Sequence, residues 1–318
     1  MGCVRDSGSY ESSDVMRAAV ANNLAVVAAA ITVLLWASSF VVIRFAGETF
    51  SPGALTVTRL AVGSAVLVVI ALRYRRPLPR GKGLALVIGY GLVWFAGYTV
   101  LLNWAEQHLD AGTAALLVNF APILVAVFAG LFLGEGFPRQ LVIGILVAFS
   151  GVLLIALGGS GGSNNDKLGI ILGLITAVLY AVGVLMQKVA LRTVDAVTAT
   201  WVGCLAGFLA TLPFAPKAVS ELSEASAGAI AAVIFLGVGP TAIAFLTWAY
   251  ALSRTDAGKM AATTLAVPAI AIVLSWIFLG EVPTLLGLIG GAMALAGVAI
   301  SRRRSRVRPQ SPEPAVTS

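Results

Sequence analysis

The sequence predicts an all-α polytopic membrane protein with ten transmembrane helices in two inverted five-helix repeats. Three observations predict this fold class: the composition, the spacing of the apolar runs and an internal repeat. Of the 318 residues, 59% are hydrophobic and only 11% are charged. Because a soluble domain carries about 25% charged residues, these charges could not cover the surface of a soluble protein. The composition therefore excludes an ordinary soluble enzyme, a disordered chain and a coiled coil.

Ten runs of the chain are long and apolar enough to cross a bilayer, which takes about 20 residues per helix. They are 24–46, 53–72, 84–105, 112–133, 139–157, 168–190, 197–214, 227–250, 258–279 and 284–301. Turn residues and charges separate neighbouring runs. The Gly/Ser-rich segment 158–167 joins the fifth run to the sixth and has the composition of a flexible linker.

The segments outside these runs are polar. Residues 1–23 lack the basic start, short apolar run and cleavage site of a signal peptide, and Asp6 departs from the myristoylation pattern that begins at Gly2. Residues 302–318 are rich in Arg and Pro. We expect both segments to be disordered cytoplasmic tails.

The Lys and Arg residues predict the orientation. With the N-terminus in the cytoplasm, 17 of the 21 fall on the inner side and three, Arg44, Lys167 and Lys217, on the outer side, while Arg59 lies inside a span. Cytoplasmic loops carry the excess of positive charge in membrane proteins. We therefore expect a multi-pass protein of the cell (inner) membrane with both termini cytoplasmic. Because the Lys and Arg residues are placed in this way, we expect the net charge of +7 to face the lipid bilayer and not to bind nucleic acid.

An internal repeat relates residues 24–157 to residues 168–301. At a shift of 146 residues the matches are Asp110-Ala111-Gly112 with Asp256-Ala257-Gly258, Pro122 with Pro268, and Leu133-Gly134-Glu135 with Leu279-Gly280-Glu281. Because each repeat holds five spans, an odd number, the second repeat must lie inverted relative to the first. Inverted repeats are typical of alternating-access transporters, whose site lies near the midplane between the repeats.

Several motifs, in this order along the chain, resemble a known family. They are Trp36-Ala37-Ser38-Ser39-Phe40, Asn103-Trp104-Ala105, Asn119-Phe120-Ala121-Pro122, the two Leu-Gly-Glu segments, and Pro240-Thr241-Ala242-Ile243-Ala244-Phe245. Over residues 24–301 the set resembles the EamA-type transporters of the drug/metabolite transporter (DMT) superfamily. The resemblance implies ten helices around a central cavity and the export of small metabolites such as amino acids. It does not name the cargo.

Seven residues are candidates for binding a small-molecule substrate. They are Trp36, Ser38, Ser39, Arg59, Tyr98, Asn119 and Tyr180. Trp36 and Tyr180 lie near the middle of their runs, away from the interfacial belt where Trp and Tyr usually sit. Arg59 lies about 9 Å inside its run at 1.5 Å per residue, and an intramembrane arginine indicates a functional site. Snorkelling of Arg59 to the outer headgroups is the alternative interpretation.

Three prolines predict helix breaks or hinges: Pro122, Pro240 and Pro268. A proline leaves the carbonyl four residues earlier without its helical donor. Pro122 and Pro268 occupy equivalent positions in the two repeats, and matched interruptions of this kind point to a binding site between the repeats. A structural kink, satisfied by a neighbouring Ser or Thr, is the alternative.

The residue types that are missing from the spans also limit the functions that the protein could have. No Asp or Glu falls at mid-membrane depth, and the two Cys and one His predict no metal site, cofactor or catalytic set. We expect a transporter that exports neutral, zwitterionic or anionic metabolites, amino acids or their derivatives, and not an enzyme. Without a deep carboxylate, downhill export fits as well as proton antiport. The alternatives are a non-transporting scaffold or receptor and, less favoured, an intramembrane enzyme.

The fifth and tenth spans are rich in small residues, which let helices approach closely. Gly144, Ala148 and Gly151 lie in the fifth span, and Gly287 and Gly291 form a G-x-x-x-G pair in the tenth. This pattern predicts either packing within one chain or a homodimer through these two helices.

Overall fold

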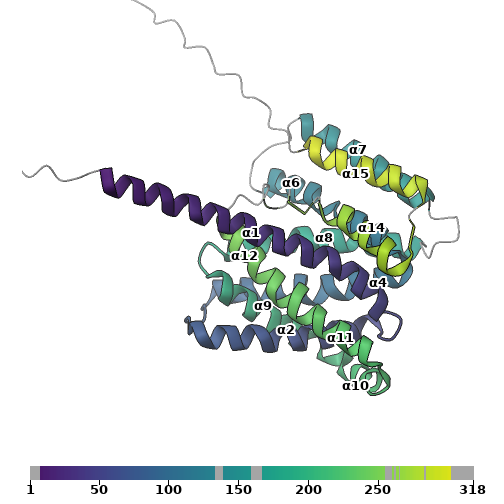
Figure 1. The fold of residues 1–318 in the computed structure, drawn as a ribbon, viewed down its shortest axis with the longest axis horizontal. Helices are drawn as coiled ribbons and strands as arrows, with labels where there is room; N and C mark the ends of the chain where they lie inside the picture. Colours follow the sequence, from purple (N-terminus) through teal and green to yellow (C-terminus); the bar gives the residue numbers. More distant parts are fainter. Residues whose placement is uncertain are drawn as a thin grey trace, which may run out of the picture.

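The computed structural model describes residues 8–132, 139–158, 167–254, 260, 263–264, 266–282 and 284–301. Over these residues every regular element is a helix (Figure 1). The helices of the first half are α1 (Gly8–Ala46), α2 (Pro52–Tyr74), α3 (Lys82–Tyr90), η1 (Gly91–Tyr98), α4 (Thr99–His108), α5 (Ala111–Val118), α6 (Ala121–Phe132) and α7 (Arg139–Gly158). Those of the second half are α8 (Lys167–Ala190), α9 (Ala196–Thr211), η2 (Leu212–Phe214), α10 (Ala215–Glu224), α11 (Ala227–Leu236), η3 (Gly237–Ile243), α12 (Ala244–Arg254), α14 (Ala266–Leu279) and α15 (Leu285–Ser301).

Six continuous helical stretches are long and apolar enough to cross a membrane. They are Asn23–Ala46, Pro52–Tyr74, Lys82–His108, Lys167–Ala190, Ala196–Glu224 and Ala227–Arg254. Among the described residues, four shorter apolar stretches overlap the other four predicted spans: Ala111–Val125, Val142–Gly151, Ala266–Leu279 and Leu285–Gly297. The protein is therefore a polytopic helical membrane protein, while the count of ten spans stays a prediction.

The N-terminal segment differs from the expected disordered tail. Helix α1 begins at Gly8, so residues 8–23 continue the first span as helix. The reason is local, because no Pro or internal Gly interrupts the chain between Gly8 and Ala46, and the segment 15–21 is rich in Ala, a strong helix former.

Helix α1 runs through the body of the molecule and packs along α12 and α14 (Figure 1). Helices α7 and α15 lie side by side as a pair at one edge of the view, and α15 reaches the body through α5 and α6. Glycines make this pair possible. A Cβ on Gly151 would lie 3.1 Å from the Ala294 Cα, and one on Gly297 would lie 2.7 Å from the Ala148 Cβ. These small residues therefore serve packing within one chain, and the predicted homodimer stays untested.

Two spans contain π-helical turns near their middle. In the span Lys82–His108, η1 separates α3 from α4, and in the span Ala227–Arg254, η3 separates α11 from α12. Pro240 lies inside η3, where its missing N–H removes a helical hydrogen bond. Such wide turns shift the register of the residues that follow and are frequent at functional sites.

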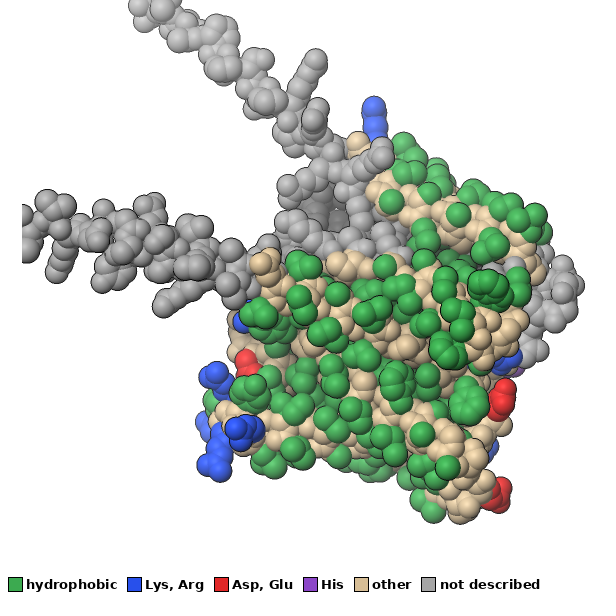
Figure 2. Space-filling model, in the orientation of Figure 1, with side chains coloured by type: hydrophobic (Ala, Val, Ile, Leu, Met, Phe, Trp, Pro, Cys, Tyr) green, Lys and Arg blue, Asp and Glu red, His purple; other side chains and the backbone are tan. Residues whose placement is uncertain are grey.

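The face drawn in Figure 2 is apolar around the middle and charged at the ends. On the face shown, Lys and Arg side chains gather at the end where α2 finishes at Tyr74, and a broad hydrophobic band separates them from the opposite end. Many large apolar side chains of the described residues are exposed, among them Val69, Trp276 and Phe278. Such a band is what lipid contact requires.

Candidate functional site

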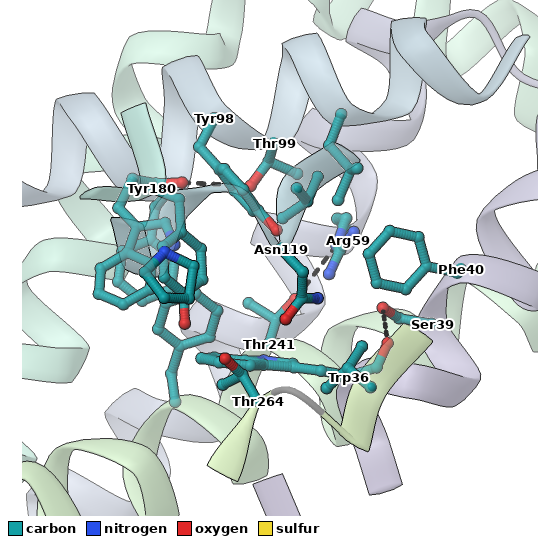
Figure 3. A pocket seen from close by; sticks show the side chains of 17 residues that line it. Trp36, Ser39, Phe40, Arg59, Tyr98, Thr99, Asn119, Tyr180, Thr241 and Thr264 are labelled. Carbon is teal, nitrogen blue, oxygen red and sulfur yellow. Dashed lines mark hydrogen bonds between the residues drawn. The ribbon is translucent and has the colours of Figure 1, made fainter. Parts of the chain in front are cut away.

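A small cavity lies at the centre of the helical body (Figure 3). Its walls come from α1, α2, η1, α4, the junction of α5 with α6, α8, η3, and the first turns of α12 and α14. Six of the seven predicted substrate-binding residues line it: Trp36, Ser39, Arg59, Tyr98, Asn119 and Tyr180. The open space is about 30 Å³, room for about two water molecules. In this conformation the cavity is contracted around the side chains that line it.

Arg59 is buried within the protein and does not reach towards headgroups. Its side chain is 5% exposed, and its Nε donates a hydrogen bond to the Thr241 Oγ1 at 3.1 Å. Its Nη1 has no hydrogen-bond partner among the described residues. Two glycines let α2 approach η3 closely enough for this contact, since a Cβ on Gly63 would lie 2.7 Å from the Thr241 Cγ2, and one on Gly237 would lie 2.8 Å from the Arg59 carbonyl oxygen. The cavity wall thus carries a guanidinium with an unused donor.

Asn119 lies at a break in the helical path. Helix α5 ends at Val118 and α6 begins at Ala121, so Asn119 and Phe120 form a turn directly before Pro122. The Asn119 Nδ2 donates to the Ala115 carbonyl at 3.1 Å, whereas its Oδ1 finds no donor in the part of the chain that the structure describes. Figure 3 shows Asn119 and Arg59 projecting into the same space. The wall therefore offers an unused acceptor near an unused donor.

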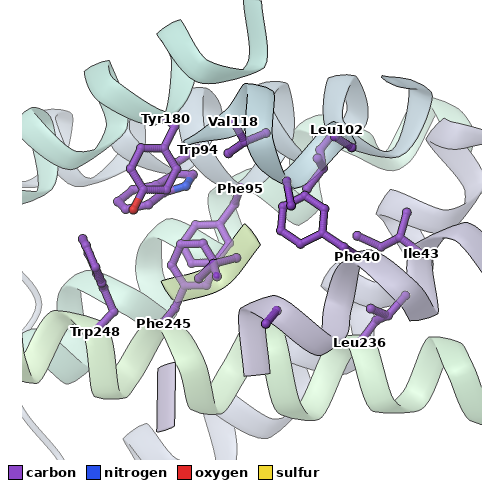
Figure 4. Packing of buried hydrophobic residues seen from close by; sticks show 14 of the residues in the cluster. Phe40, Ile43, Trp94, Phe95, Leu102, Val118, Tyr180, Leu236, Phe245 and Trp248 are labelled. Carbon is purple, nitrogen blue, oxygen red and sulfur yellow. The ribbon is translucent and has the colours of Figure 1, made fainter. Parts of the chain in front are cut away.

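Aromatic rings line the cavity on the side towards the C-terminal ends of α8 and α12. Trp36 packs against Trp248 with ring centroids 4.9 Å apart, and Tyr180 packs against Trp94 at 5.1 Å. Figure 4 shows Trp94, Tyr180, Phe245 and Trp248 gathered into this cluster. The Trp36 Nε1 donates to the Pro240 carbonyl at 3.3 Å, so the indole is held in place by η3.

Gln187 forms hydrogen bonds with two aromatic residues, Trp248 and Tyr90. Its Oε1 accepts a hydrogen bond from the Trp248 Nε1 at 3.0 Å, and its Nε2 donates to the Tyr90 hydroxyl oxygen at 2.9 Å. Next to it the Lys188 Nζ donates to the Leu252 carbonyl at 2.8 Å, which joins α8 to α12. These contacts hold α8 against α3 and α12 at this end, which we call the Gln187 end.

Ser38 does not reach the cavity. Its Oγ donates to the Leu35 carbonyl, and the residue lines a separate apolar groove of about 510 Å³ between α1, α11 and α14. Because an α-helix turns about 100° per residue, Ser38 and its neighbour Ser39 face different directions. Of the prolines, Pro122 lines the cavity, whereas Pro240 and Pro268 do not. Pro268 lies in the first turn of α14.

Polar contacts close the opposite end, which we call the Arg44 end. The Arg44 Nε donates to the Glu281 Oε1 at 3.0 Å, and its Nη1 donates to the Glu106 carbonyl at 3.1 Å. The Glu281 Oε2 accepts hydrogen bonds from the Ser275 Oγ at 2.6 Å and the Ala111 backbone N–H at 3.1 Å. Arg44 and Glu281 thereby connect α1 and the segment after α14 to α4 and α5.

Sequence reasoning missed the importance of Glu106. It counted Glu106 with the loop that follows the third span, but the structure includes it in α4 and buries it to 1% exposure. One signal was available in the sequence, because Arg44 is a cation predicted at the same end of the molecule and therefore at similar depth. Glu281, which the sequence analysis used only as part of the repeat, is paired with Arg44.

Comparison with known proteins places the chain among transporters. It is 35% identical over 283 residues to a protein of Streptantibioticus cattleyicolor named "Probable terminal-alkyne amino-acid exporter", covering 88% of this chain and 94% of that one. It is 33% identical over 264 residues to the "Uncharacterized transporter YdfC" of Bacillus subtilis, covering 83% of this chain and 86% of that one.

The fold and the family agree with these relatives. A known crystal structure aligns with a TM-score of 0.62 at 22% identity, covering 87% of this chain and 96% of that chain, which is a similarity of fold alone. The sequence profile of the EamA-like transporter family matches residues 23–157 and, a second time, residues 167–303. The chain therefore belongs to the EamA-like transporter family and is a multi-pass membrane transporter.

Proposed function

We propose that this transporter exports small solutes of the amino-acid type by alternating access. In this proposal ten spans form two inverted repeats, both termini lie in the cytoplasm, and the solute binds in the central cavity. The observation that carries the proposal is the Arg59 Nη1, a buried cationic donor that faces the cavity with no partner among the described residues. Burying such a donor is costly unless a ligand or water satisfies it.

The chemistry of the wall supports a zwitterionic solute. A guanidinium binds a carboxylate through charge-assisted hydrogen bonds, which are the strong ones in proteins. An ammonium group would find the unused Asn119 Oδ1 as an acceptor and the faces of Trp36 and Tyr98 as cation–π partners. The amino-acid exporter named among the relatives supports the same solute class.

The contracted cavity supports alternating access. About 30 Å³ of space cannot hold an amino acid, and contacts hold the helices together at both the Arg44 end and the Gln187 end. Binding a solute therefore requires the helices to separate at one end. A transporter that opens its two ends in turn would pass through a closed conformation of this kind.

A flux assay tests the proposal. Proteoliposomes loaded with a pool of labelled amino acids should release a subset of them faster than empty liposomes do, and Arg59→Ala should reduce that release to the level of empty liposomes. Arg73→Ala is the matched control, because Arg73 is an exposed arginine in the last turn of the same helix. Release that Arg59→Ala leaves unchanged, or no release of any pooled solute, would contradict the proposal. The second outcome would favour a scaffold or receptor.

A further inference from the structure

Glu106 stands between the cavity and the contacts that close the Arg44 end. On its span, Tyr98 and Leu102 line the cavity, and Glu106 follows eight residues after Tyr98, about 12 Å further along the helix axis. Its backbone carbonyl accepts the hydrogen bond from the Arg44 Nη1. We call the contacts among Arg44, Glu281, Ser275 and the backbone of Glu106 and Ala111 the Arg44 latch. A change at Glu106 can therefore act directly on this latch.

The Glu106 carboxyl group is buried without a donor. The side chain is 1% exposed, and neither the Oε1 nor the Oε2 has a hydrogen-bond partner among the residues that the structure describes. An ionised carboxylate has about four acceptor positions to satisfy. Burial of such an anion with none of them satisfied is strongly unfavourable, and proteins avoid it by neutralising the group. A proton on Glu106 removes this penalty while the latch stays closed.

The charges around Glu106 already balance without it. The charged groups that act on its carboxyl are Arg44 of α1, Arg59 of α2, Asp110 before α5 and Glu281 after α14. Within its own span, the Tyr98 hydroxyl group also acts on it. The two arginines and two acids sum to zero. An ionised Glu106 would leave one unbalanced negative charge in this partly buried set, beside Glu281 and Asp110, which both repel it.

The two other acids have donors that Glu106 lacks. Glu281 accepts hydrogen bonds from Arg44, Ser275 and the Ala111 N–H. Asp110 caps α5, where its Oδ1 accepts from the Thr113 N–H at 2.7 Å. The Arg44 Nε, the Ser275 Oγ and the N–H groups of Ala111 and Thr113 are thus already used by these two acids. Glu106 is the acid in this set whose environment suits a neutral carboxyl group.

We propose that Glu106 is a proton-binding site whose protonation is required for the Arg44 latch to close. Opening the latch would hydrate Glu106 and allow it to release the proton, so the closed state binds one proton more than the open state. Linkage then determines the sign: the closed state is favoured at low pH, and its population falls as the pH rises. One proton changes the ratio of closed to open molecules by at most about tenfold per pH unit. This inference goes beyond the proposed transport of amino acids, because its ligand is a proton and its test needs no solute.

A distance measurement across the latch tests the inference. Spin labels on Thr49→Cys and Val282→Cys would report the separation of the two sides, because Thr49 is exposed in the turn after α1 and Val282 is 72% exposed after α14. The full chain would carry Cys3→Ser, and Cys204 stays in place because it is fully buried. In lipid nanodiscs we expect a short distance to dominate at pH 5.5 and a longer one to grow by pH 8.5. With Glu106→Gln, which mimics the protonated acid, the short distance should dominate at both values.

The matched control is Glu48→Gln. Glu48 is an exposed carboxylate four residues after Arg44 and outside the latch, so this variant should keep the pH response of the unaltered chain. A distance distribution that does not respond to pH, or a Glu106→Gln variant that responds as the unaltered chain does, would overturn the inference. So would a Glu48→Gln variant that loses the response.

A second readout covers the case in which Glu106→Gln does not accumulate. Infrared difference spectra of the unaltered chain between the two pH values should then show a protonated carboxylic-acid band that grows with the short-distance population. Absence of that band would count against the inference. If the band and the distances behave as expected while no amino acid is transported, the inference stands and the proposed function fails.

Discussion

Arg59 is the residue on which the chemistry of the cavity depends. Its Nε is held by Thr241, while its Nη1 is left for another group. In the proposed function this division makes the guanidinium a positioned donor, because one nitrogen fixes its orientation and another is left for a solute. The aromatic residues differ in role, since they define the shape of the cavity on the side towards the Gln187 end.

We expect Arg59→Ala to weaken binding of a transported amino acid by about ten- to a hundredfold, because a hydrogen bond to a charged group contributes about 1.5–3 kcal/mol. Arg59→Lys should restore part of the affinity, since a lysine keeps the charge and loses the planar fork. Isothermal titration with the purified protein measures both changes. The methyl ester of the same amino acid lacks the carboxylate and should bind Arg59→Ala and the unaltered chain about equally. A full loss with the ester as well would point to misfolding.

Trp36 and Tyr180 should affect affinity together. Both line the cavity, and their ring centroids lie 6.1 Å apart, so a bound solute would contact both. We expect Trp36→Ala and Tyr180→Ala each to lower affinity, and the double variant to lose less or more than the sum of the two, because contacting residues are energetically coupled. Phe50→Ala is the control. It removes a buried ring outside the cavity, so it should lower the melting temperature with little change in affinity. Independent, additive effects of Trp36 and Tyr180 would argue against a shared solute.

At the scale of the elements, the contact between α2 and η3 positions Arg59. This contact requires glycine at positions 63 and 237, because the two helices lie so close there that a side chain would not fit. The π turn of η3 presents Thr241 to Arg59 directly after Pro240. The two glycines, Pro240 and the π turn together hold the Arg59 side chain at the cavity.

We expect Gly63→Ala to lower the melting temperature, even though alanine favours a helix by about 0.5–1 kcal/mol over glycine. The added Cβ would lie 2.7 Å from the Thr241 Cγ2, and overpacking of this kind costs about 1–3 kcal/mol. Gly228→Ala is the matched helical control, since its Cβ would approach no heavy atom closer than 3.7 Å. Its melting temperature should stay the same or rise. Equal melting curves for the two variants would show that α2 and η3 can separate freely.

At the scale of the whole molecule, the cluster of basic side chains and the Arg44 latch lie at opposite ends. Lys and Arg gather at the end where α2 finishes, which is the end predicted to be cytoplasmic (Figure 2). The latch lies at the other end, where α1 finishes at Ala46. If the predicted orientation holds, Glu106 exchanges its proton with the outer side.

The orientation can be measured with reporter fusions. A reporter that is active only outside the cytoplasm should be active when fused after Asp166 and inactive when fused after Arg76 or Arg304. This follows from the excess of Lys and Arg on the cytoplasmic side. An inactive fusion after Asp166, with the protein present in the membrane, would contradict both the predicted topology and the inverted repeats.

The sequence by itself determined the class of the protein and the depth of most candidate residues. Apolar runs and charges are local properties, so they indicated a polytopic membrane protein and positioned Trp36, Arg59 and Tyr180 inside spans. Helical periodicity then sets which residues share a face, but not which face meets a cavity. That choice depends on the neighbouring helices, which explains why Ser39 reaches the cavity and Ser38 does not.

Only the tertiary structure decided the role of Glu106. In the sequence it is an acid near the end of a span, where water would normally solvate it. The packing of α1, α2, α5 and α8 around α4 removes that water, and Glu281, distant in sequence, and the nearby Asp110 accept from the donors at this end. Whether a group is buried and whether it finds a hydrogen-bond partner depend on contacts between segments far apart in the chain. No local sequence pattern could therefore reveal that the Glu106 carboxyl group lacks a partner.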